Sequence, residues 1–192
     1  ISRLLGELDQ ILALREPAIL RQLAEVRVNR SSVINWSDEE QIERLDLVEK
    51  WLSRVFHSDQ RVMIKASSFV SPLAKPLLAT GGTALILFTS LERYLYTILA
   101  GGASKQEAAA LADIRLATKE TLSLAGTAAL GWLCEMVTLH DAHTQCPEAK
   151  VAWMDFDHFL SGPAGQLQWA ARHFEQELSA EQALALVSGP IM

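Results

Sequence analysis

The sequence lacks several features that mark common classes of protein. Only two of its 192 residues are cysteines, Cys134 and Cys146, so it has no disulfide framework. Its formal net charge is −6, whereas nucleic acid or an anionic membrane surface requires a basic face. We therefore expect no nucleic-acid partner. The low cysteine count is typical of a reducing compartment, and we expect the protein to be cytoplasmic.

The sequence also lacks an apolar run long enough to cross a membrane. Its longest uncharged run extends from Pro76 to Leu91, and Glu92 and Arg93 follow directly. A spanning helix needs about 20 consecutive apolar residues, so we expect no membrane span and interpret the run as buried core. Because the sequence begins with Ile1 and not with Met, we expect a fragment of a longer chain, with any targeting signal upstream.

The sequence motifs of the common nucleotide-binding and hydrolase folds are missing as well. We find no Gly-x-Ser-x-Gly, no Gly-x-x-x-x-Gly-Lys-Ser/Thr and no Gly-x-Gly-x-x-Gly. No set of catalytic residue types converges elsewhere. We therefore expect a protein that is not an enzyme and that needs no cofactor.

What the sequence does have is a helical spacing of apolar residues with helix start signals between the segments. No sustained alternation of apolar and polar residues bounded by hairpin turns interrupts it. We therefore predict an all-α fold, a single-domain bundle of roughly seven to nine helices over residues 1–192. Its central helix is expected from Pro76 to Ala100. The other expected helical segments cover residues 2–14, 17–26, 37–56, 58–69, 104–116, 126–139, 147–160, 163–178 and 179–186, of which 2–14 with 17–26, and 104–116 with 126–139, are each expected as one helix or as two.

The helix from Ser37 to Phe56 has the clearest pattern. Ser37 and Glu40 form a predicted capping box, in which each side chain bonds the other residue's backbone amide. The spacing also predicts one buried face, which we expect to include Trp51 and Phe56. The members of that face are Ile42, Leu45, Val48, Trp51, Leu52, Val55 and Phe56.

A short segment after the helix expected at 126–139 collects groups that bind metals. His140, His143 and Cys146 fall within seven residues of one another on an expected loop, together with Asp141. Imidazole and thiolate ligands suit Zn²⁺, but a structural zinc site normally has four ligands. The pattern leaves two interpretations open, a zinc site at His140, His143 and Cys146, or a polar connection whose histidines cap the preceding helix.

The last third of the chain is rich in aromatic residues. We expect a C-terminal helical hairpin layer over residues 147–188, with its turn at Ser161-Gly162-Pro163. Phe156, Phe159 and Phe174 are predicted to be core residues. Trp153 and Trp169 are predicted to lie nearer the surface and to bind a partner, because aromatic anchors dominate many protein interfaces.

Three functional classes follow from these observations. The hypothesis that we favour is a protein-interaction module, such as an adaptor, regulatory or assembly subunit, that binds a protein partner or forms a homo-oligomer. The first alternative is a metal-dependent helical enzyme that uses the segment from His140 to Cys146. The second is a small-ligand pocket between helices. Its expected lining residues are Phe88, Tyr94, Tyr96 and Trp132.

Overall fold

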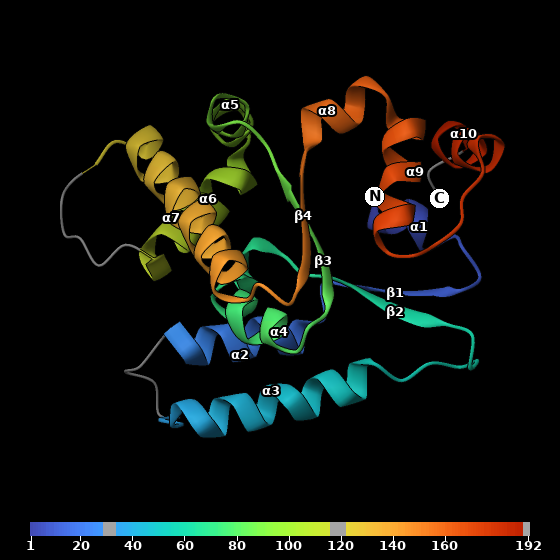
Figure 1. Cartoon of the computed structure of the whole chain (residues 1–192). Coiled ribbons are helices and arrows are strands. Elements are labelled where there is room, and N and C mark those ends of the chain that lie inside the picture. Colours follow the sequence, from blue (N-terminus) through green and yellow to red (C-terminus); the bar gives the residue numbers. More distant parts are fainter. Residues whose placement is uncertain (29–33, 116–121, 190–192) are drawn as a thin grey trace.

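The computed structural model describes residues 1–28, 34–115 and 122–189, and within them the fold is mixed α/β, so the all-α prediction is wrong. The described strands are β1 (Ile11–Arg15), β2 (Arg61–Lys65), β3 (Thr83–Phe88) and β4 (Lys150–Asp155). They form two parallel pairs, β1 with β2 and β3 with β4. Helices nevertheless make up most of the structure (Figure 1).

The helices precede, connect and follow these strands. They are α1 (Ser2–Leu5), α2 (Ala18–Val28), α3 (Asp38–Leu52), the 3-10 helix η1 (Ser68–Leu73), α4 (Ala74–Ala79), α5 (Leu91–Ala100), α6 (Gly102–Arg115), α7 (Leu124–Gln145), α8 (Phe156–Ser161), α9 (Pro163–His173) and α10 (Ala180–Ser188). The helix expected at 104–116 corresponds to α6, and Leu116 lies outside the described residues.

Both sheets are built by the same type of connection. Parallel strands cannot be joined by a tight hairpin and need a crossover. α2 and α3 lie on the crossover between β1 and β2, while α5, α6 and α7 lie on the one between β3 and β4. In register, Ile11 pairs with Arg61 in the first sheet and Thr83 pairs with Lys150 in the second. In Figure 1, α7 lies on one side of the β3–β4 pair and α8 and α9 on the other.

The predicted central helix, Pro76 to Ala100, is divided into α4, β3 and α5. Gly81 has a φ of +77°, a conformation that glycine adopts without steric cost, and it ends the helical path after α4. β3 then contains the β-branched residues Thr83 and Ile86, which favour strands. Ser90 restarts the helix, because its hydroxyl accepts from the amide of Arg93 at the beginning of α5.

The helices expected at 2–14, 58–69 and 147–160 are interrupted in the same way by β1, β2 and β4. Each strand is a short run with little apolar-polar alternation, and such a run fits a buried parallel strand as well as a buried piece of helix. The local start signals fare better. The sequence predicts capping boxes at Ser37, Ser104 and Ser179. Those at Ser37 and Ser179 are present and Pro163 occupies the first turn of α9, whereas α6 begins at Gly102, ahead of Ser104.

Buried apolar residues gather in three clusters. The first joins the two sheets, because Ile11 of β1 and Met154 of β4 pack in it with Leu167 of α9. The second lies between α2, α3 and η1 and includes Leu20 and Leu45. The third lies between α4 and the end of α7. Within the described ranges, no helix is long and apolar enough to span a membrane.

Candidate interaction surface

The residues of the expected metal site do not lie on a loop. His140 and His143 belong to the last turns of α7, and Cys146 is buried directly after that helix. The Cys146 thiol donates to the carbonyl of Lys75 over 3.6 Å, and Nδ1 of His143 accepts from the indole of Trp153. In residues 1–28, 34–115 and 122–189, no group of three His, Cys, Asp or Glu side chains is placed to hold a metal ion.

The two tryptophans of the expected partner site have different surroundings. Trp153 lies on β4, half-buried, with its ring 6.0 Å edge-on from the ring of Phe88. Trp169 is 39% exposed on α9 and stacks on His173. The structure therefore does not bring Trp153 and Trp169 together as one exposed pair of anchors.

The phenylalanines and the expected hairpin also depart from the prediction. Phe159 is buried as expected and Phe174 is half-buried, but Phe156 is 39% exposed. Residues 150–155 form a strand, so the C-terminal layer over 147–188 is not a simple helical hairpin. The turn before Pro163 instead joins the short helix α8 to α9.

The expected ligand-pocket residues face different surroundings too. Tyr96 is 79% exposed on α5, whereas the indole Nε1 of Trp132 donates to the carbonyl of Thr89 over 3.1 Å. The ring of Phe88 packs against the ring of Trp153. The Trp132 bond ties α7 to the end of β3, and the ring contact joins β3 to β4.

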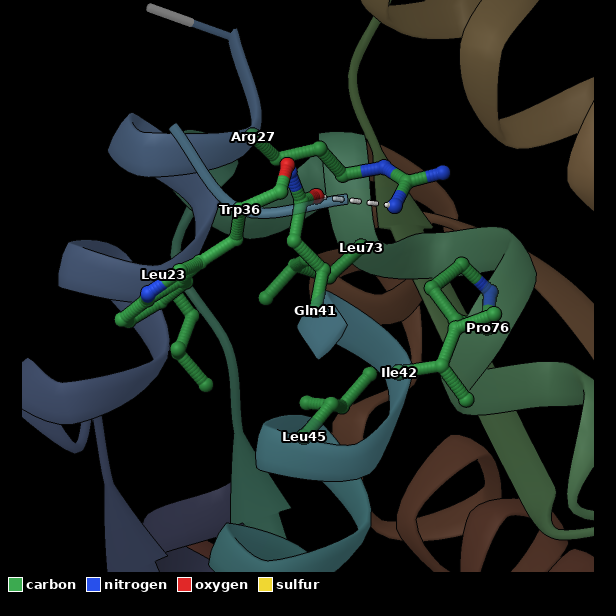
Figure 2. Close-up of a pocket in the computed structure, with 8 residues that line it drawn as sticks. All are labelled: Leu23, Arg27, Trp36, Gln41, Ile42, Leu45, Leu73 and Pro76. Atoms are coloured by element: carbon green, nitrogen blue, oxygen red, sulfur yellow. Dashed lines mark hydrogen bonds between the residues drawn. The ribbon is translucent and has the colours of Figure 1, made fainter. Parts of the chain in front are cut away.

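A pocket is found instead at the amino end of α3 (Figure 2). Its side chains come from α2, α3, η1, α4 and the segment just before α3. Arg27 donates to Oε1 of Gln41 over 3.2 Å. Its lining residues are Leu23, Arg27, Trp36, Gln41, Ile42, Leu45, Leu73 and Pro76. The cavity volume is about 10 Å³, which is room for one water molecule. Pockets for drug-sized ligands have volumes of about 300–1,000 Å³, so this one does not suit such a ligand.

The strongest candidate for a functional surface is the flank of α3 that is not buried against α2 and η1. Leu45 and Val48 are buried against α2 and η1, and they fix how the helix is rotated. Leu47 and Trp51 lie off that buried line and are 46% and 61% exposed. In Figure 1, α3 lies at the lower edge of the molecule beneath α2. The structure thus corrects the sequence interpretation, which placed Trp51 in the core.

Exposed apolar residues occur on this flank of α3 and in the segment that follows it. Leu47 and Trp51 are four residues apart on α3, a spacing that puts their side chains on one side of the helix. Val55 follows the end of α3 at Leu52 and is 38% exposed. Phe56 comes directly after Val55 and is 82% exposed. We call these four residues the outer α3 surface.

Phe56 is presented by an ordered turn. Oε1 of Gln60 accepts from the amides of both Phe56 and His57, at 3.2 and 3.3 Å. Nε2 of Gln60 donates to the carbonyl of Asp9 over 3.1 Å, which ties the turn to the segment before β1. Fixing the backbone in advance lowers the entropy cost of using Phe56 as a contact.

The comparisons with known proteins give no relative from which to infer an activity. No family model, no curated protein and no solved structure matches the chain.

Proposed function

We propose that this chain is a non-enzymatic protein-interaction module and that its partner docks on the outer α3 surface. The observation that carries the proposal is the exposure of Trp51, 61%, on a helix that also has buried residues, and of Phe56, 82%, in the turn that follows the helix. Large aromatic side chains are enriched among the residues that dominate binding energy in protein interfaces. Single exposed apolar residues are ordinary on any surface, but here four of them fall between Leu47 and Phe56, which favours a binding site.

The setting of the surface supports the same proposal. Exposed charged residues border the outer α3 surface, among them Glu43 and Arg54. A polar rim around an apolar centre is the usual arrangement of a protein interface. Both cysteines are free, which supports our proposal that the module works in the cytoplasm.

The experiment compares two double variants, each of which truncates two exposed apolar side chains to alanine. Trp51→Ala with Phe56→Ala removes the aromatic part of the outer α3 surface. Tyr96→Ala with Leu184→Ala removes two exposed apolar residues elsewhere, which are 79% and 59% exposed. Proteins bound by immobilised wild type and by each variant are quantified by mass spectrometry, and the partner found is then purified and titrated against all three.

We expect the α3 variant to bind the purified partner at least about 30-fold more weakly, which corresponds to about 2 kcal/mol. The control variant should keep wild-type affinity, and the melting temperature of both should change little. Equal binding by the α3 variant and by wild type would overturn the proposal.

A further inference from the structure

The exposed side of α3 is acidic toward its amino end and apolar toward its carboxyl end. Glu43 lies four residues before Leu47, and Glu40 lies three residues before Glu43. Residues three or four apart are neighbours on a helix, so the two carboxylates continue the line of Leu47 and Trp51. All four side chains are exposed. The apolar contacts of the outer α3 surface therefore begin where these carboxylates end.

The other charges of α3 do not neutralise its acidic half. The helix has six carboxylates and two basic residues, and the basic residue in its amino-terminal half, Arg44, holds its guanidinium 4.3 Å over the ring of Trp36. The carboxylates belong to Asp38, Glu39, Glu40, Glu43, Asp46 and Glu49. In the described part of the chain, none of the six forms an ion pair, whereas Glu16, Glu25 and Glu175 all do. They are therefore available to cations on a partner.

We infer that the partner of the outer α3 surface is a cationic amphipathic helix. Its apolar side covers Leu47, Trp51 and Phe56, and Lys or Arg residues at one end meet Glu40 and Glu43. The inference rests on the proposed function, since it names the kind of partner that the same surface takes. Lys and Arg form charge-assisted hydrogen bonds with carboxylates, and the side chains of one helix pack between those of another.

The basic residues at the other end of the surface limit where the partner's charge lies. Lys50 directly precedes Trp51, Arg54 follows it three residues later, and both basic residues are exposed. Lysines along the whole partner helix would meet like charges there, which oppose association. The partner's cations therefore gather at the end that lies over Glu40 and Glu43. An anionic lipid surface or a nucleic acid meets the same carboxylates and is repelled by them.

The test titrates two synthetic helical peptides, which share one apolar side of leucines, into the purified full chain by calorimetry. At one end the residues beside the leucines are lysines in the first peptide and glutamates in the second. Glu40→Gln with Glu43→Gln removes the proposed contacts and keeps a capping box, because Gln closes it as Glu does. Glu177→Gln with Glu181→Gln is the control, since it makes the same change in net charge at exposed positions elsewhere. Trp51→Ala removes an apolar contact.

We expect the lysine peptide to bind wild type with a Kd below about 100 μM, and the glutamate peptide to bind at least about tenfold more weakly. The α3 double variant should bind the lysine peptide at least about fivefold more weakly than wild type, because its two amides offer no charge-assisted bond. Trp51→Ala should also weaken binding. The control variant should keep wild-type affinity.

The inference is overturned if the lysine peptide does not bind, if both peptides bind equally, or if both glutamine double variants lose affinity equally. It is also overturned if Trp51→Ala binds the lysine peptide as wild type does. A wild-type dimer in sedimentation velocity that Trp51→Ala dissociates overturns it too, because the occupant is then a second copy. The proposed function fails separately, only if loss of Trp51 and Phe56 weakens binding to no protein, including a second copy.

Discussion

The indole Nε1 of Trp153 lies 3.1 Å from Nδ1 of His143 and forms a hydrogen bond with it. The bond joins one residue of the expected partner site to one residue of the expected metal site. Indole nitrogen only donates, so Nδ1 of His143 must accept. His143 therefore carries its proton on Nε2. The bond ties β4 to the last turns of α7.

This pairing predicts a measurable tautomer. The ¹⁵N chemical shifts of His143 should report an unprotonated Nδ1 and a protonated Nε2 at neutral pH. Trp153→Phe should lower the free energy of unfolding by about 1–3 kcal/mol, because it leaves a half-buried acceptor without its donor. Trp169→Phe, in a more exposed tryptophan, is the control and should cost less. A protonated Nδ1 in the spectrum would contradict the contact.

Glu175 predicts a loss of stability in acid. Its carboxylate accepts from Arg61 over 2.9 Å and lies 3.7 Å from the Lys150 ammonium, and these two cations lower the pKa of Glu175. A carboxyl group whose pKa is lower in the folded than in the unfolded state stabilises above the unfolded pKa. The contribution is lost as pH falls through the folded pKa.

Glu175→Gln should therefore destabilise the protein at pH 7 and make little difference at about pH 2, below the usual pKa range of a carboxyl group. Urea unfolding at both pH values measures the effect. Glu177→Gln changes the same charge at an exposed position nearby and should leave stability nearly unchanged. An equal effect of both substitutions would show that net charge, and not the ion pairs of Glu175, is responsible.

Glu49 predicts the opposite dependence. Partial burial raises the pKa of Glu49, and the neighbouring Asp46 carboxylate adds to the rise. The folded state therefore keeps the proton to higher pH than the unfolded state, so this group makes stability fall as pH rises through that window. Glu49→Gln should stabilise the protein at pH 7, and the gain should vanish at about pH 3. Glu43→Gln, at an exposed position of the same helix, should show no such gain.

Two glycine substitutions should shift stability in opposite directions. Gly81 has a φ of +77° and open space where a Cβ would lie, so Gly81→Ala should cost about 1–2 kcal/mol from backbone strain alone. Gly131 lies inside α7, also with nothing within 4 Å of an added Cβ. Gly131→Ala should therefore stabilise by about 0.5–1 kcal/mol. Thermal unfolding of the two variants beside wild type measures both, and a stabilised Gly81→Ala would contradict the left-handed turn before β3.

The sequence by itself determined the features that depend on neighbouring residues. The capping boxes at Ser37 and Ser179 could be identified because a cap is made between residues three positions apart. Pro163 at the start of α9 follows from the fixed φ of proline. The exposed flank of α3 also left a signal, since Leu47 and Trp51 lie four residues apart and off the line of Leu45 and Val48.

Only the tertiary structure decided whether the short apolar runs became strands. A strand in a parallel pair depends on hydrogen bonds to a partner far away in the sequence, such as Ile11 with Arg61 or Thr83 with Lys150. No local pattern encodes that partner, and a five- or six-residue apolar run fits helix and strand alike. The same holds for His143 and Trp153, and for the free flank of α3. Contacts and burial of this kind exist only after separate segments have packed together, and they override local preference.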